Sequence, residues 1–260
     1  MLDWICEVMQ ARHARRLGRI QQLWGGYGEL VRVALDGSFA QTVVVKVVAP
    51  PTAETDTVSD ARKRRSYEVE EQFYRHYAPR CDARCRVARM FASRHIGDAR
   101  WFALEDLGDG AAPLAACLVW LAAFHARFLG DPGDGLWPEG TYWHLATRLD
   151  ELSIDSARAR SLDQALADAR FQTIVHGDAK EENFLAAGAV DFQYAGRGCG
   201  MKDVAYLLHG HGDAHLDAYF RHLRAAVSPS VDAAALEREW RALYPIAQQD
   251  FARFLAGWRG

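Results

Sequence analysis

A polar loop between two short apolar stretches limits the possible folds of this chain more than any other feature. The loop reads "HGDAKEENF" at residues 176–184, and "VDF" follows at residues 190–192. The stretches beside it, "FQTIV" and "FLAAGAV", predict short strands. The connection between the two motifs is short but permits a tight hairpin. An Asp after one strand, an Asn further along the loop and an Asp at the end of the next strand are therefore predicted to meet.

This set of side chains suits phosphoryl transfer. That reaction needs an oriented nucleophile and a metal ion that bridges phosphate oxygens. Asp178 is placed to accept a proton, while Asn183 and Asp191 are placed to share Mg²⁺. Two other interpretations stay open here: a polar loop in which Asp178 caps a helix, and a hydrolytic metal site built on His176 and Asp178. A hydrolytic site would need more ligands, for which the dense candidates are His209, His211 and His215.

Composition narrows the class of protein. Of the 260 residues 50% are hydrophobic and 25% charged, which is ordinary for a globular protein. A formal net charge of −3 argues against nucleic-acid binding, and we interpret the arginine-rich segments 12–19 and 62–65 as solvated helical faces. The N-terminus lacks a signal-peptide pattern, and no apolar run reaches the roughly 18 residues of a membrane span. We therefore expect a cytoplasmic protein without a membrane partner, whose five cysteines are buried thiols.

The first part of the chain reads mainly as strands. Residues 20–48 contain strand-like segments separated by glycine turns, and two more strands surround the "GD" turn at residues 97–98. Residues 60–77 predict a helix opened by an Asp60 cap. Residues 1–106 are thus predicted to form a small antiparallel, β-rich N-terminal lobe that binds nucleotide.

The pattern becomes helical after "LEDLGDG". Pro113 opens an apolar helix, and two helices are predicted near the C-terminus, the second beginning at Pro245. Residues 107–260 therefore predict a larger helical C-terminal lobe that carries the polar loop, the metal site and substrate-binding helices. The fold class is α+β, with two lobes.

Kinase chemistry also predicts a lysine in an N-terminal strand and a glutamate on the following helix. "VVVKVV" places Lys46 within an apolar strand, where an unpaired ammonium would be costly to bury. Glu70 shares a helix face with aromatic residues such as Tyr67 and Phe73, so we predict that it pairs with Lys46. The alternative is a lysine that reaches solvent from an edge strand.

Two further segments are candidates for nucleotide binding. Gly25, Gly26 and Gly28 in "GGYG" fit a loop over the phosphates, although a plain hairpin turn fits nearly as well. Backbone groups of Glu105 and Leu107 in "FALEDLGDG" are placed to hydrogen-bond an adenine. The chain has no G-x-x-x-x-G-K-[ST] sequence, which argues against a P-loop enzyme.

Together these motifs resemble the aminoglycoside phosphotransferase and choline kinase superfamily, small-molecule kinases with a protein-kinase-like fold. The resemblance is strongest to the ecdysteroid-kinase-like branch and its bacterial relatives, and it spans roughly residues 20–258. It depends on Lys46, Glu70, "LEDLGDG", "HGDAKEENF", "VDFQYAGRGCGMKDVAYLL" and "LYPIAQQDFARFLAGW". The short, irregular glycine loop departs from the family pattern.

The resemblance implies a role for each matching residue. Asp178 would be the catalytic base, Asn183 and Asp191 the Mg²⁺ ligands, and Lys46 the anchor of the ATP phosphates. His176 would brace the catalytic loop. Two further matching positions are Lys180, which would reach the γ-phosphate, and Asp203, which would be structural. His125 also matches a family position, and we predict that it is a packed core histidine.

We therefore expect an enzyme that transfers the γ-phosphate of MgATP to a hydroxyl of a small substrate, with no obligate protein partner. A protein kinase is one alternative, but no A-P-E sequence closes an activation loop. A nucleotide-binding, pseudokinase-like module is another, but binding alone needs no catalytic base. Aminoglycosides, amino alcohols, steroid-like alcohols and sugars all remain open as acceptors.

Three residues are candidates for contact with the acceptor. Asp250 is predicted to point inward, where a carboxylate would select a cationic or polyhydroxylated molecule. A satisfied cap or a buried hydrogen bond is the alternative for Asp250. Tyr194 and Trp143 are candidates for the wall of the site, with ordinary core packing as the alternative for each.

Overall fold

The structure is a computed structural model that describes residues 1–50, 57–148 and 156–258. Its N-terminal part is an antiparallel sheet and its C-terminal part is mainly helical, which confirms the predicted α+β class. Two compact units are present. The first consists of Met1–Pro79 and Val87–Gly108, and the second of Arg80–Arg86 and Asp109–Gly260.

The first unit is built on a five-stranded antiparallel sheet with the strand order β1-β2-β3-β5-β4. Its strands are β1 (His13–Gln22), β2 (Gly28–Asp36), β3 (Thr42–Val48), β4 (Met90–Ile96) and β5 (Ala99–Glu105). Runs of β-branched residues such as "TVVVKVV" favour this conformation. The hairpin formed by β4 and β5 confirms the strands predicted around the "GD" turn.

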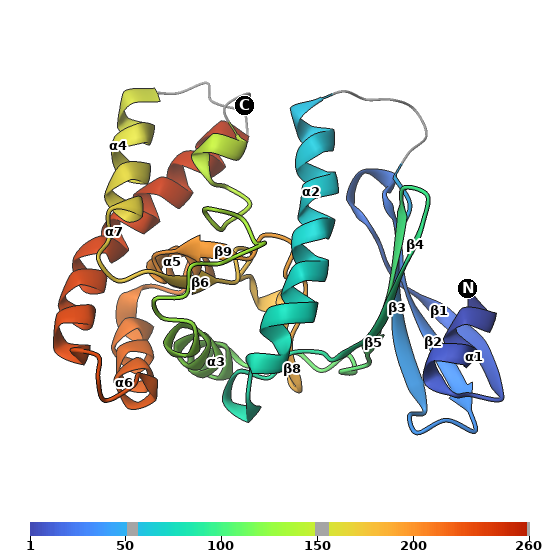
Figure 1. Cartoon of the computed structure of the whole chain (residues 1–260). Helices are drawn as coiled ribbons and strands as arrows, with labels where there is room; N and C mark the ends of the chain where they lie inside the picture. Colours follow the sequence, from blue (N-terminus) through green and yellow to red (C-terminus); the bar gives the residue numbers. More distant parts are fainter. Residues whose placement is uncertain (51–56, 149–155, 259–260) are drawn as a thin grey trace. The chain divides into compact units, whose positions relative to one another are not determined.

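Side chains alternate between the two faces of this sheet. Val43 and Val45 of β3 pack in a core with Trp4 and Ile5 of the N-terminal helix α1 (Leu2–Met9), which was not predicted from the sequence (Figure 1). Lys46 therefore points to the opposite face of the sheet from Val45. This alternation leaves one face for the α1 core and directs Lys46 to the other.

Helix α2 (Val58–Gln72) confirms the predicted helix and continues into a π-helical turn, Phe73–Tyr77. The predicted cap at Asp60 is wrong. Thr57 is the N-cap residue, and its hydroxyl accepts a hydrogen bond from the Asp60 amide at 3.1 Å. Asp60 lies instead in the first turn, where a carboxylate is favoured by the helix dipole.

The arginine-rich segment 12–19 is not a helical face, as we had interpreted it. It lies mostly in β1, an edge strand whose side chains are largely exposed. The side chains of an exposed edge strand need not alternate between apolar and polar residues. The pattern of charges in this segment therefore could not distinguish a strand from a helix.

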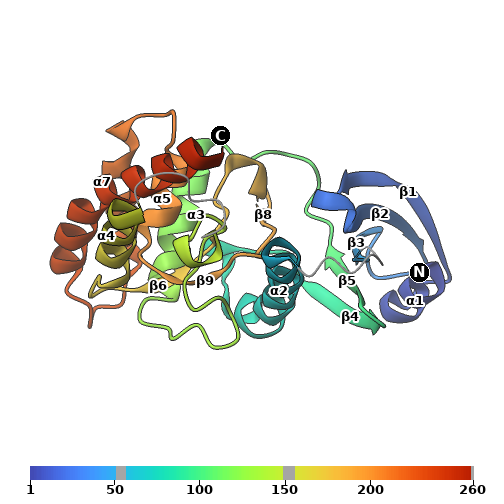
Figure 2. The same cartoon turned by 90° about the horizontal axis from the view of Figure 1, so that it is seen from above.

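The second unit contains five α-helices among its described residues. They are α3 (Leu114–Arg127), α4 (Ser156–Ala167), α5 (Met201–Leu207), α6 (Leu216–Ala226) and α7 (Ala233–Trp258). Helix α3 packs on α6 (Figure 1), while α4 and α5 pack on α7 (Figure 2). Two small sheets accompany the helices: β6 (Thr173–Val175) with β9 (Gly196–Gly198), and the hairpin β7 (Phe184–Leu185) with β8 (Gly188–Ala189).

The predicted break before Pro245 is wrong, because α7 continues through this residue. A proline inside a helix removes one backbone hydrogen bond. Buried side chains on both sides of it, including Trp240 and Phe251, keep the helix packed in the unit. Tertiary packing therefore outweighs the local penalty.

Two smaller expectations can be compared with the structure. No helix among the described residues combines the length and the apolar composition that crossing a bilayer requires. None of the five cysteines, all of which lie among the described residues, forms a disulfide, and Cys85, Cys117 and Cys199 are buried as predicted. Cys6 and Cys81 are only partly buried.

Candidate active site

In the first unit, Lys46 and Glu70 form a buried ion pair. Lys46 Nζ lies 2.8 Å and 2.7 Å from the two carboxylate oxygens of Glu70. The side chains are only 4% and 1% exposed, so bulk water hardly reaches either charge and each balances the other. The ring of Tyr67 also lies 5.5 Å from Lys46 Nζ. Glu70, which was selected by its helix face, thus lies beside the lysine of β3.

The three glycines lie in a tight turn between β1 and β2. Gly25 and Gly26 belong to a single 3₁₀ turn, and Gly28 begins β2. A Cβ atom on Gly28 would lie 1.9 Å from the carbonyl oxygen of Val47, so only glycine fits there. Tyr27, within the turn, is buried and its hydroxyl is hydrogen-bonded to Asp60 of α2. The turn is therefore fixed to the helix that carries Glu70.

The end of β5 and the segment after it contain Glu105 and Leu107. The Glu105 amide donates to the carbonyl of Arg89 at 2.8 Å, so a contact with an adenine would have to use the Glu105 carbonyl. Asp106 accepts hydrogen bonds from Arg32 at 2.7 Å and from the Gly108 amide at 3.0 Å. Burial raises the pKa of Asp106, but these bonds outweigh burial and lower it. Asp106 thus ties the segment that includes Leu107 to β2.

In the second unit, Asp203 at the start of α5 holds the backbone of the polar loop. Its carboxylate accepts hydrogen bonds from the amides of His176 at 2.6 Å and Gly177 at 3.0 Å. His125, completely buried, lies 3.1 Å from the same carboxylate through Nε2 and 2.7 Å from the Tyr219 hydroxyl through Nδ1. A row of buried groups from α6, α3 and α5 therefore supports the loop.

His176 joins the loop to the strand that precedes Asp191. Its Nε2 lies 2.9 Å from the Val190 carbonyl oxygen, and its Nδ1 accepts from the Asp178 amide at 3.3 Å. Both ring nitrogens are thus engaged with the backbone, and the residue is fully buried. This geometry does not suit a metal ligand, which argues against the hydrolytic site considered from the sequence.

Asp178 lies at the centre of a group of polar side chains. Asn183 Nδ2 donates to Asp178 Oδ2 at 3.0 Å and to the Asp178 carbonyl at 2.8 Å. Lys180 Nζ lies 3.1 Å from the same carboxylate oxygen. Burial lowers the pKa of Lys180, but the negative charges of Asp178 and Asp191 outweigh it and the pKa is raised. The structure thus brings Asn183 and Lys180 into contact with Asp178, and Asp191 lies near enough to Lys180 for its charge to act on that ammonium.

The donor set fits a hard divalent cation. The Asn183 amide nitrogen is used by Asp178, so its amide oxygen is the atom with which Asn183 would bind a metal. Asp191 adds a carboxylate, and oxygen ligands are those that Mg²⁺ prefers. Asp191 also has a positive φ of 66°, a conformation that Asp tolerates better than most residues. Val190, next to it, donates its amide to the Asn183 carbonyl at 3.0 Å, which holds the two ligands together.

Two tyrosines near Asp178 were missed or given little weight in the sequence analysis. Tyr142 donates its amide to the Gly177 carbonyl at 3.0 Å, and its hydroxyl lies 3.5 Å from that of Tyr206. Burial, together with the negative charge of Asp178, raises the pKa of Tyr206. Tyr206 lies one helical turn after Asp203, and that spacing is the signal that could have identified it.

The preceding residue, Thr141, has a φ of 112°, which is strained for a β-branched side chain. Its amide donates to the Tyr194 carbonyl at 3.2 Å, so the strain is held by contacts with the segment after Asp191. Tyr194 is partly buried, stacks on Trp137 and meets Tyr142 edge to face. Aromatic side chains therefore lie beside the loop of Asp178.

The other two acceptor candidates lie in the interior of the second unit. Asp250 is fully buried and pairs with Arg253, whose Nε lies 2.9 Å from Asp250 Oδ1. Burial raises the pKa of Asp250. Trp143 is also fully buried and packs against Phe251 and Phe254. Neither Asp250 nor Trp143 presents a surface to a ligand in this structure.

No protein-family model matches the sequence, and no curated protein matches it. Solved structures match it along nearly its whole length. A protein of Haemophilus somnus 129PT assigned as a fructosamine-3-kinase has 11% identity and a TM-score of 0.53, with 98% of this chain and 90% of that one covered. A protein of Thermobifida fusca YX-ER1 with the same assignment has 18% identity and a TM-score of 0.51, with 100% and 99% covered.

A third match is the GDP complex of aminoglycoside 2'-phosphotransferase-IIIa. It has 12% identity and a TM-score of 0.53, with 99% of this chain and 95% of that one covered. Similarity at such low identity is a similarity of fold. The chain therefore has the fold of these phosphotransferases, as its motifs predict.

Proposed function

We propose that the protein is a small-molecule kinase that transfers the γ-phosphate of ATP to a hydroxyl group. The arrangement around Asp178 carries the proposal: a carboxylate that contacts both Asn183 and Lys180, with Asp191 within electrostatic reach of Lys180. A binding module would need no carboxylate in this position. The similarity in fold to fructosamine-3-kinases and an aminoglycoside phosphotransferase supports a small acceptor.

In this proposal Asp178 orients the acceptor hydroxyl and takes its proton as the oxygen attacks the γ-phosphorus. Asn183 holds one carboxylate oxygen of Asp178 and thereby fixes the direction of the other. Lys180, whose raised pKa keeps it cationic at neutral pH, neutralises negative charge on the transferred phosphoryl group. Proton removal, orientation and charge neutralisation are thus assigned to side chains of one loop.

Asn183 and Asp191 would hold Mg²⁺, which would neutralise negative charge on the phosphates. Lys46 binds the α- and β-phosphates, and Glu70 keeps its ammonium oriented through two short contacts. The glycines of the β1–β2 turn and the backbone of Glu105 and Leu107 are proposed to contact the nucleotide as well. His176 and Asp203 act only by holding the loop in place.

The test is nucleotide consumption in the presence of Mg²⁺ against a panel of hydroxylated molecules. The panel contains amino sugars, glycated amines, amino alcohols and sterols, each with ATP and with GTP. We expect turnover with one class of acceptor and a loss of about a hundredfold or more in kcat for Asp178→Asn, the range of general-base contributions. Asp217→Asn, a change at an exposed aspartate of the same unit, is the control and should keep full activity. Absence of turnover with every acceptor, or equal activity of the Asp178 variant, would contradict the proposal.

A further inference from the structure

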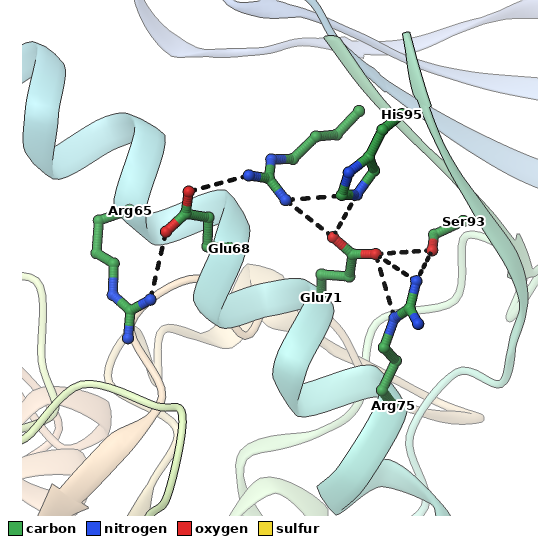
Figure 3. Close-up of polar contacts among 7 residues, drawn as sticks. Arg65, Glu68, Glu71, Arg75, Ser93 and His95 are labelled. Carbon is green, nitrogen blue, oxygen red and sulfur yellow. Dashed lines mark hydrogen bonds and ion pairs between the residues drawn. The ribbon is translucent and has the colours of Figure 1, made fainter. Parts of the chain in front are cut away.

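The residue beside Glu70 on helix α2 is held by an unusually dense set of contacts. Glu71 is only 5% exposed, and its carboxylate lies among side chains from the helix and from strand β4 (Figure 3). Glu68, one turn earlier on the same helix, also pairs with arginines but is 41% exposed. The two glutamates therefore have similar partners and very different burial.

The Glu71 carboxylate makes five polar contacts. Oε1 accepts from Arg75 Nε at 3.2 Å, from Arg75 Nη2 at 2.7 Å and from Ser93 Oγ at 2.7 Å. Oε2 lies 2.8 Å from His95 Nε2 and accepts from Arg100 Nη1 at 3.0 Å. Arg75 belongs to the helical segment itself, whereas Ser93 and His95 belong to β4 and Arg100 to β5. Both oxygens are thus tied to the sheet.

The strand register places this anchor in line with the Lys46–Glu70 pair. Lys46 of β3 is opposite Phe102 of β5, and Phe102 is opposite Ser93 of β4. Residues directly opposite each other in a sheet point to the same face. Lys46, Phe102 and Ser93 thus form one row of directly opposed residues across the sheet. Two consecutive residues of α2 bind to this row, Glu70 to Lys46 of β3 and Glu71 to Ser93 of β4.

The contacts of Glu70 and Glu71 together fix the position and orientation of the helix more strictly than either set alone. With the Glu70 contact only, α2 could rotate or slide until Glu70 left Lys46, because a single pair defines a point and not an orientation. The Glu71 contacts lie one and two strands away from β3, on β5 and β4, and involve both carboxylate oxygens, so they oppose such a rotation. Hydrogen bonds to a buried charge are also the strong ones.

We propose that Glu71 is a positioning residue that keeps Glu70 against Lys46 by anchoring α2 to β4 and β5. The inference rests on the proposed function for its kinetic consequence, a weaker grip on the nucleotide phosphates when the anchor is lost. Its structural consequence, the release of Lys46 from Glu70, does not depend on any activity. The two can therefore be measured separately.

The first measurement is the rate at which Lys46 reacts with acetic anhydride, followed by mass spectrometry. Lys46 is 4% exposed and paired, so we expect it to react slowly relative to the more exposed Lys180, which is the internal reference. Glu71→Gln should raise the relative rate at Lys46 about tenfold, the effect of losing bonds to a charged group. Glu70→Gln sets the rate of a fully released lysine.

The matched control is Glu68→Gln, which removes a carboxylate of the same helix that contacts Arg65 and Arg100 but leaves Glu71 intact. We expect its Lys46 to react as in the unchanged protein. An unchanged rate in folded Glu71→Gln, or an equal rise in Glu68→Gln, would overturn the proposal. If Glu71→Gln does not fold, Ser93→Ala removes one donor only and should raise the rate about threefold. No rise in folded Ser93→Ala would overturn the proposal as well.

The second measurement is kinetic. Glu71→Gln should raise KM for MgATP about tenfold and leave KM for the acceptor unchanged, and it should add little in the Glu70→Gln background because both changes release the same lysine. Additive effects would mean that Glu71 does not act through Glu70. A protein without turnover would contradict the proposed function, whereas the labelling result would still decide the role of Glu71.

Discussion

At the scale of single residues, the second position of the loop at residues 176–184 has no room for a side chain. Gly177 has a φ of +82°, and a Cβ atom there would lie 2.0 Å from the Tyr194 carbonyl oxygen. Its amide donates to Asp203 at 3.0 Å, so the backbone cannot move without breaking that bond. The position of Asp178, next along the chain, depends on this fit.

We predict that Gly177→Ala lowers the free energy of unfolding by about 3 kcal/mol or more, because it combines a left-handed conformation with a steric clash. Gly97→Ala is the matched control. Gly97 also has a positive φ, +56°, but nothing lies within 4 Å of the added atom. Its cost should be about 1 kcal/mol, that of the backbone conformation alone. Urea unfolding of both variants measures the difference, and equal losses would show that the contact with Tyr194 is not limiting.

Most of the residues that the structure brings together can be predicted from the sequence. The helix face shared with Tyr67 and Phe73 identifies Glu70, and the loop spacing identifies Asp178 and Asn183. Asp250 is predicted to face inward and Trp143 to line the wall of the site, and both are buried. Facing inward does not separate a substrate pocket from a packed core, and that distinction needs the tertiary structure.

At the scale of elements, charged groups contribute to the attachment of helix α2 to the sheet. Burial raises the pKa of Glu71, but hydrogen bonds from Ser93, His95 and Arg75 outweigh it and lower the pKa to about 2. A carboxylate with a lowered pKa stabilises the folded state fully above its unfolded value, near 4.5, and this contribution is lost as the pH falls toward 2.

The second prediction is therefore a difference in acid sensitivity. Between pH 6 and pH 3 the unchanged protein should lose about 2 kcal/mol more unfolding free energy than Glu71→Gln, which has no carboxylate at this position to protonate. Urea unfolding at a series of pH values tests it. Parallel curves for the two proteins would contradict the lowered pKa.

Element boundaries were the least predictable part of the fold. Thr57 caps α2 instead of Asp60. Both residue types are good caps, so the sequence does not select between them, and the backbone conformation does. Helix α7 passes through Pro245 because buried side chains on both sides of the proline pack against the rest of the unit. Neither outcome is determined by the local sequence. The apolar strands and the helix after Pro113 are determined by it, and they were predicted correctly.

At the scale of the whole molecule, the proposed function predicts that nucleotide and metal stabilise the folded chain. A ligand at a hundred times its Kd adds about 2.7 kcal/mol to the unfolding free energy. We expect saturating MgATP to raise the thermal midpoint of the unchanged protein, and EDTA to reverse part of the rise. In Asp191→Asn the Mg²⁺-dependent part should be missing. The same midpoint with and without Mg²⁺ in the unchanged protein would argue against a metal bound by Asn183 and Asp191.

The division of the chain has a practical consequence for dissecting the protein. Arg80–Arg86 belongs to the second unit although the residues on both sides of it belong to the first. Within that segment Asp82 pairs with Arg127 of α3 at 2.8 Å, and the Arg86 carbonyl accepts from Trp120 at 2.8 Å. A fragment that ended at residue 108 would carry these partners of α3 without α3 itself. The first unit is consequently a poor candidate for expression on its own, and experiments should use the full-length chain.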